Sequence, residues 1–292
     1  MDINKLSFNP SLCFINGKWI QPHRGKFIEL TNPSSGKILC KISRGSSEDI
    51  DHAVKAAQNS DWVHSTALER GRVLLKMSQM VLNEVELLAE LEANDVGKPL
   101  TQARGDAIAL ARYLEFYGGA SDKIHGETIP YLKGYTVYTL REPHGVTGHI
   151  VPWNYPMQII GRSIGAALAM GNTTVLKPAE EACLSALAFA DIASRAGLPE
   201  GALNVVPGLG SEAGASLACH PGINHISFTG SEVVGKKIQA AAAKNVVPVT
   251  LELGGKSPQI VFEDADLEAA LPFLVNSGIQ NAGQTCSAAS RI

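Results

Sequence analysis

A strand, a helix and a second strand follow one another in VTGHIVPWNYPMQIIGRSIGAALAMGNTTVLKPAE, residues 146–180. Residues 146–151 predict a buried strand, the apolar residues of 158–170 recur at helical spacing, and residues 173–176 predict a second strand. Strands joined through a helix run parallel in one sheet. The stretch therefore predicts a βαβ unit.

The same alternation continues downstream. Strands are predicted near 203–206, 225–228, 247–251 and 259–262, with helices near 183–195, 213–218 and 231–244. Upstream, residues 14–42 predict strands joined by turns, and helices are expected from Ser47, over 67–94 as one long region, and over 100–116. Residues 135–140 alternate bulky β-formers and predict another strand. Together these elements predict an α/β fold with a doubly wound parallel sheet that binds ligands at the carboxyl ends of its strands.

Composition excludes several classes of protein. The net charge of −3 gives no basic face for nucleic acid. No apolar stretch reaches the ~18 residues of a membrane helix, and the N-terminus does not resemble a secretory signal. The 5 cysteines are scattered without a Cys-x-x-Cys pair, so we expect neither a disulfide framework nor a metal site. A cytoplasmic location is the simplest interpretation.

Lys177 and Glu180 follow the strand at 173–176. A lysine at a strand end can donate to ribose hydroxyls, and a nearby carboxylate can accept from the adenosine 2′-OH. That carboxylate would repel the 2′-phosphate of NADP, which favours NAD. Taken alone, a Lys-Pro turn with a glutamate is usually a solvated loop.

Two turns are candidates for phosphate binding. The glycines of 208–214 are spaced one residue too widely for a dinucleotide fingerprint, so this run is more often an ordinary strand-to-helix turn. In residues 228–235, Gly230 turns the chain and Ser231 is placed to cap a helix whose free N–H groups can receive a phosphate. A plain serine cap is the alternative.

Three residues are candidates for the chemistry. Asn154 lies between two prolines at a strand end, where a rigid amide can donate to an oxyanion, although an isolated Asn-x-Pro more often makes a turn hydrogen bond. Cys286 is surrounded by small and amide residues, at a predicted turn or helix start that would supply a backbone N–H. Glu252 lies between Leu251 and Leu253, and a carboxylate among leucines suits a general base.

A cysteine hydrolase is an alternative for Cys286. Its nucleophile would need a histidine partner such as His149, His220 or His225. The Gly-Gln-Thr-Cys setting matches no papain-like or caspase-like signature, and such an enzyme has no use for a nucleotide-binding fold. A requirement for NAD would separate the two functions.

The motifs occur in the order Pro-Trp-Asn, Lys-Pro-Ala-Glu, Phe-Thr-Gly-Ser-x-x-x-Gly, Leu-Glu-Leu-Gly-Gly-Lys-Ser-Pro and Gly-Gln-x-Cys. From about residue 14 to 292 the chain resembles the NAD(P)-dependent aldehyde dehydrogenase superfamily. The resemblance implies that Cys286 is the nucleophile, Glu252 the base that activates the deacylating water, and Asn154 the oxyanion donor. It also implies a cofactor site made by Pro152, Trp153, Lys177, Glu180, Gly210, Phe228, Gly230, Ser231, Val234, Gly235 and Leu253.

The reaction that the resemblance implies is oxidation of a small-molecule aldehyde to a carboxylic acid, through a thiohemiacetal and then a thioester on Cys286. Glu252 indicates water as the acyl acceptor, because relatives that transfer the acyl group to coenzyme A generally lack this glutamate. NAD is the expected cofactor, with NADP disfavoured by Glu180.

The resemblance also predicts a division into domains. Residues 1–122 and 143–252 would form a Rossmann-like cofactor domain, 123–142 a protruding hairpin that serves oligomerisation, and 253–292 the start of a second, catalytic α/β domain. A homodimer or homotetramer is then expected. Few residues follow Cys286, so we expect the chain to be the front part of a longer enzyme; a catalytically inactive fragment is the alternative.

Overall fold

The computed structural model describes Ile3 and residues 6–292. Its central sheet has seven strands in the order β11-β10-β7-β8-β9-β1-β2. These strands are β1 (Cys13–Ile15), β2 (Lys18–Ile20), β7 (Val146–Ile150), β8 (Thr173–Lys177), β9 (Leu203–Val205), β10 (His225–Gly230) and β11 (Val249–Leu253). Strands β7 to β11 run parallel, whereas β1 pairs antiparallel with β9 and β2. The predicted α/β fold with a parallel, doubly wound sheet is confirmed.

The chain begins the parallel part of the sheet in its middle. From β7 it winds outward through β8 and β9, and then returns to the other side of β7 to add β10 and β11. The connections after β7 and β9 therefore leave in opposite directions. In open α/β sheets the crevice at such a reversal, beside the carboxyl ends of the strands, is the usual binding site.

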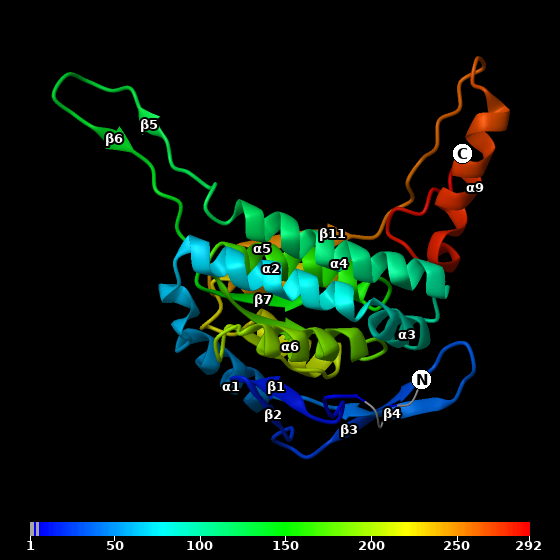
Figure 1. The fold of residues 1–292 in the computed structure, drawn as a ribbon, viewed down its shortest axis with the longest axis horizontal. Coiled ribbons are helices and arrows are strands. Elements are labelled where there is room, and N and C mark those ends of the chain that lie inside the picture. Colours follow the sequence, from blue (N-terminus) through cyan, green and yellow to red (C-terminus); the bar gives the residue numbers. More distant parts are fainter. Residues whose placement is uncertain (1–2, 4–5) are drawn as a thin grey trace.

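Helices cover both faces of this sheet (Figure 1). One buried apolar cluster packs the five helices α2, α3, α4, α5 and α6 against one face of the sheet. A second cluster packs α1, α7 and α8 against the other face. The bounds are α1 (Ser47–Gln58), α2 (Ala67–Asn83), α3 (Val85–Val96), α4 (Leu100–Ala120), α5 (Pro156–Ala169), α6 (Leu184–Ala196), α7 (Ala215–Ala218) and α8 (Glu232–Ala243).

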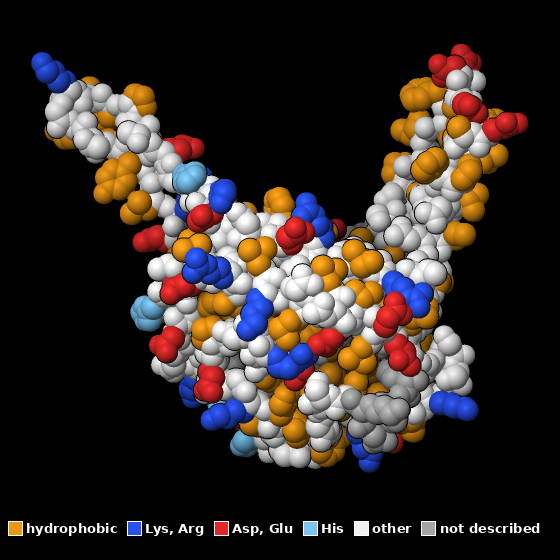
Figure 2. Space-filling model, in the orientation of Figure 1, with side chains coloured by type: hydrophobic (Ala, Val, Ile, Leu, Met, Phe, Trp, Pro, Cys, Tyr) orange, Lys and Arg blue, Asp and Glu red, His pale blue; other side chains and the backbone are white. Residues whose placement is uncertain are grey.

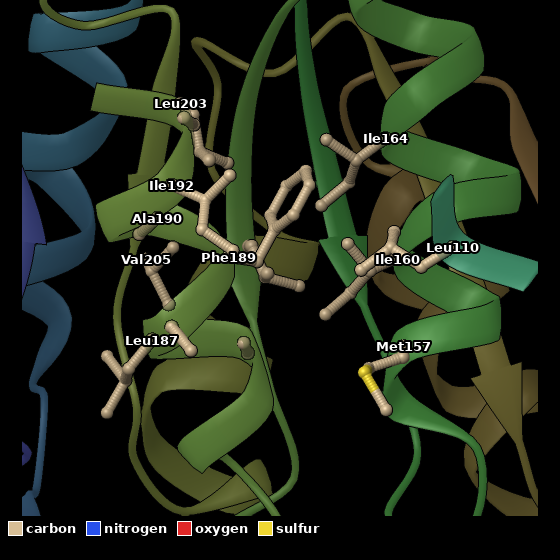
Figure 3. Close-up of a cluster of buried hydrophobic side chains, with 14 of the residues drawn as sticks. Leu110, Met157, Ile160, Ile164, Leu187, Phe189, Ala190, Ile192, Leu203 and Val205 are labelled. Atoms are coloured by element: carbon tan, nitrogen blue, oxygen red, sulfur yellow. The ribbon is translucent and has the colours of Figure 1, made fainter. Parts of the chain in front are cut away.

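The two clusters form because side chains alternate along each strand. Val175 and Leu176 are neighbours on β8, yet they belong to different clusters, since successive strand residues point to opposite faces. On the α5–α6 side, Phe189 of α6 faces Ile160 and Ile164 of α5 (Figure 3). Both faces of the sheet are thus buried, which holds the strand ends in fixed positions.

Two segments project from the body of the molecule (Figure 1). One is a hairpin of β5 (Thr128–Ile129) and β6 (Val137–Tyr138), and the other ends in α9 (Leu267–Ile279). Apolar side chains gather on both (Figure 2); Leu132 on the hairpin is 64% exposed and Phe273 on α9 is 78% exposed. A separate antiparallel pair, β3 (Phe27–Thr31) and β4 (Ile38–Ser43), lies near the N-terminus.

Several elements differ from the sequence-based prediction. The long helical region 67–94 is two helices, because Glu84 leaves helical geometry at φ −114° and ψ 18°. The strand predicted at 135–140 shortens to β6, and the helix predicted at 213–218 begins in a π-helical turn, η3 (Gly210–Gly214). Helix α9 was not predicted. Two short 3₁₀ turns, η2 (Asp61–His64) and η4 (Gln280–Gly283), complete the described elements.

The strand predicted at 259–262 does not form. Only Pro258 makes a bridge, to Arg291, and the side chains of Ile260 and Phe262 are largely exposed. An apolar run becomes a strand only where a neighbouring segment pairs with its backbone groups, and among the described residues such pairing is limited here to the bridge at Pro258 and to the N–H of Gln259, which donates to the oxygen of Arg291 at 2.8 Å. The prediction was therefore wrong for this segment.

None of the helices that the structure describes combines the length and the hydropathy needed to cross a bilayer.

Candidate active site

A cavity of about 740 Å³ lies where β7, β10 and β11 end, at the reversal of the sheet. Its walls include eight of the residues predicted from the sequence: Pro152, Trp153, Asn154, Gly230, Ser231, Glu252, Leu253 and Cys286. They come from the ends of three strands and from the loop after α9. The three residues predicted to be catalytic therefore face one space.

Cys286 lies in a turn after η4 and is partly exposed. The Nδ2 of Asn154 donates to the backbone oxygen of Gln284, at 2.9 Å. An amide nitrogen carries two hydrogens, so this bond engages one of the two N–H donors of Asn154. This hydrogen bond ties the Asn154 amide to the backbone of Gln284, two residues before Cys286 in the chain.

Glu252 occupies an exposed position on β11, opposite Thr229 of β10. The expectation that leucines surround its carboxylate was wrong. Leu251 and Leu253 are each partly buried, while Glu252 between them points the other way, because side chains alternate along a strand. The side chain of Glu252 is therefore exposed to solvent and lines the cavity.

A second group of predicted residues lies outside this cavity, around the end of β8. The Nζ of Lys177 is buried and forms an ion pair with Oε2 of Glu180 at 2.6 Å. The other carboxylate oxygen of Glu180 accepts from the backbone N–H of Gly210 at 3.2 Å. Partial burial opposes ionisation of Glu180, yet Lys177 and these hydrogen bonds outweigh it, so its pKa lies below the ordinary value.

Glycines at the end of β10 and in α8 leave space for neighbouring side chains, and Gly235 lets α8 pack closely against β11. A Cβ at Gly230 would lie 2.5 Å from the ring of Phe228, and one at Gly235 would lie 2.7 Å from Leu253. Ser231 caps α8, its Oγ accepting from the N–H of Val234 at 3.4 Å. The first N–H groups of an α-helix have no partner within the helix, and the cavity wall includes Ser231 and Glu232 from this turn.

Helix α5 adds lining residues that the sequence prediction missed. Gln158 and Arg162 stand one helical turn apart and both line the cavity. The signal was present, since these two long polar side chains, at i and i+4, interrupt a mostly apolar helix. Tyr155, which begins this helix, lines the cavity as well.

A buried charge cluster supports the wall formed by Tyr155. The ammonium group of Lys98 is paired with Glu92 at 2.7 Å and with Asp106, and it lies 4.1 Å from the centre of the Tyr155 ring. Gln158 donates to Asp106 at 2.6 Å. Burial raises the pKa of Glu92 to about 8, against the opposing pull of Lys98. No sequence pattern pointed to this cluster, because its charges come from α3, α4 and the turn between them.

Among the described residues no group of His, Cys, Asp and Glu side chains is arranged to hold a metal ion.

Comparison with known proteins identifies the family of this chain. The sequence model of the aldehyde dehydrogenase family matches residues 19–292. Hydroxyisobutyraldehyde dehydrogenase of Mycolicibacterium austroafricanum is 44% identical, over 100% of this chain and 58% of that protein. Cytosolic aldehyde dehydrogenase 1 of Rattus norvegicus is 45% identical, over 98% of this chain and 59% of that protein.

A solved structure supports the same relationship. The NAD⁺ complex of aldehyde dehydrogenase from Bacillus cereus superimposes with a TM-score of 0.94 at 44% identity, covering 97% of this chain and 58% of that one. The chain thus spans less than two thirds of the length of these relatives. The resemblance drawn from the motifs is confirmed: the chain belongs to the aldehyde dehydrogenase family.

Proposed function

We propose that this chain contributes the cofactor site, nucleophile and base of an NAD-preferring enzyme that oxidises an aldehyde to a carboxylic acid. The observation that carries the proposal is the single cavity that Cys286, Asn154 and Glu252 share at the reversal of the sheet. It is tested by measuring NADH formation with aldehydes in an active protein that contains this chain. Turnover of a substrate without NAD would favour a cysteine hydrolase instead.

The residues present fit a dinucleotide. A Cβ at Gly230 would collide with Phe228, and a Cβ at Gly235 would collide with Leu253, so glycine at both positions keeps this space open. The first turn of α8, capped by Ser231, would donate backbone N–H groups to a pyrophosphate. On the adenosine side, Lys177 would donate to a ribose hydroxyl and the ionised Glu180 would accept from one. Trp153, 40% exposed at the cavity wall, offers an apolar surface along the cofactor.

The proposed chemistry begins at the sulfur of Cys286. Its thiolate attacks the aldehyde carbon, and the N–H groups of Asn154 and of the Cys286 backbone hold the oxyanion that results. The nicotinamide, when bound, supplies the hydride acceptor. Glu252 then takes a proton from the water that cleaves the thioester, which releases the carboxylic acid and restores the cysteine. The hydrated position of Glu252 gives water direct access to its carboxylate.

We expect Glu180→Ser to narrow the preference for NAD over NADP by about tenfold, which corresponds to ~1.4 kcal/mol. The substitution removes the negative charge that would face a 2′-phosphate. It also releases Lys177, now held 2.6 Å from Glu180, as a cation for that phosphate. The two dissociation constants are measured by titration calorimetry.

Glu181→Ser is the matched control, because Glu181 is the next residue and its exposed side chain has the same charge. It should leave the ratio of the two affinities unchanged. Equal affinities for NAD and NADP in the unmodified protein would show that Glu180 does not discriminate between them.

A further inference from the structure

Asn281, in the turn before Cys286, is fully buried. Its side-chain Nδ2 donates to the backbone oxygen of Asn154 at 3.0 Å and to that of Gln284 at 3.3 Å. Both acceptors are carbonyl oxygens, which assigns this end of the amide as the nitrogen. One side chain therefore joins the loop of the oxyanion donor to the loop of the nucleophile.

The same carbonyl oxygen of Gln284 also accepts from Nδ2 of Asn154, at 2.9 Å. The backbone N–H of Asn281 donates to Oε1 of Gln102 on α4 at 2.8 Å, and its backbone oxygen accepts from both nitrogens of Gln284. The turn is thus tied to two separate parts of the body.

These bonds hold a backbone that would not persist by itself. Asn281, Ala282 and Gly283 have φ values of 50°, 56° and 76°, a full run in the left-handed region. Each non-glycine residue there costs roughly 1–2 kcal/mol, and such conformations survive where surrounding contacts fix them. The contacts of Asn281 are the ones that fix this turn.

We infer that Asn281 is a positioning residue, which sets the distance and orientation between Cys286 and the amide of Asn154. The inference rests on the proposed function, in which these two groups act on the same carbonyl. Asn281 has its polar nitrogen engaged with two backbone oxygens and acts through its neighbours. Losing this alignment lowers the rate of the chemical step steeply, because small displacements of the reacting groups raise its activation barrier.

The test uses Asn281→Gly, which permits the left-handed backbone and removes only the amide. Ala282→Gly is the matched control, because it relaxes the adjacent left-handed residue and deletes no hydrogen bond. In an active protein that contains this chain, we expect Asn281→Gly to lower kcat about 100-fold with KM for NAD unchanged. Ala282→Gly should keep most of its activity.

A double-mutant cycle separates positioning from mere structure. In a protein that already contains Asn154→Ala, Asn281→Gly should lower kcat by less than about fivefold. The Asn154 amide, which Asn281 aligns with Cys286, is absent from that protein. Equal losses on both backgrounds would overturn the inference. Should Asn281→Gly fail to fold, Gln102→Ala removes the acceptor of the Asn281 N–H within a helix, and the same reduced loss on the Asn154→Ala background is expected.

A second measurement needs no turnover. In the 292-residue chain, amide hydrogen exchange of residues 284–286 should accelerate at least tenfold in Asn281→Gly and not in Ala282→Gly. Unchanged exchange would refute the positioning role while leaving the proposed function standing. Faster exchange together with catalysis that does not need Cys286 would refute the proposed function and leave the structural link intact.

Discussion

Replacing Cys286 by alanine is expected to abolish aldehyde oxidation, with a loss of at least about a thousandfold in kcat, while NAD binding stays nearly intact. Without the sulfur no thiohemiacetal can form, so hydride transfer has no covalent intermediate from which to proceed. The residues around Lys177 and Glu180 are untouched, since they lie outside the cavity that contains Cys286. Steady-state NADH production and calorimetric NAD titration measure the two effects.

Cys219→Ala serves as the control, because Cys219 is exposed and belongs to no part of the cavity wall. It should retain full activity. If Cys286→Ala kept more than a few per cent of the unmodified rate, Cys286 would not be the nucleophile.

Glu252→Gln is expected to produce one burst of NADH, close to one equivalent per Cys286, followed by turnover reduced at least about 100-fold. Acylation uses Cys286 and Asn154, which the substitution leaves in place. Deacylation needs a base for the attacking water, and a neutral amide cannot take that proton. Stopped-flow absorbance at neutral pH resolves the burst from the steady state.

A second carboxylate in the same cavity provides the comparison. Glu232 lines the cavity but is paired with Lys236 at 2.6 Å. At a saturating concentration of NAD, Glu232→Gln should show no burst and normal turnover. Sustained turnover by Glu252→Gln would remove Glu252 from the role of general base.

The sheet and the position of the cavity followed from local patterns. Residues 146–180 contain a complete strand-helix-strand unit, and alternation of this kind has few possible topologies. Pro152, Asn154 and Gly230 immediately follow predicted strands, so the rule that ligands bind at carboxyl ends of strands placed them near one another. Local sequence was sufficient for these three residues because each lies within a few positions of a predicted strand end.

Other features depended on contacts that no local pattern encodes. The exposure of Glu252 reflects which face of an edge strand it occupies, and the sequence Leu-Glu-Leu is compatible with either face. Residues 259–262 have the composition of a strand, but in the described part of the chain their backbone pairing with another segment stops at Gln259, which donates to Arg291. Asn281 joins Gln102 and Asn154, more than a hundred residues away in the chain, so only the fold reveals its role.

The buried charge cluster beneath Tyr155 has a consequence for how the molecule opens. Lys98 is paired with Glu92 on α3 and with Asp106 on α4. If either helix detaches from the body, Lys98 loses one of these partners. Removing one partner of a buried ion pair costs about 3–5 kcal/mol. Gln158 extends the same dependence to α5 through Asp106. We therefore expect these three helices to open as one cooperative unit, with amide protons that exchange with solvent at similar rates.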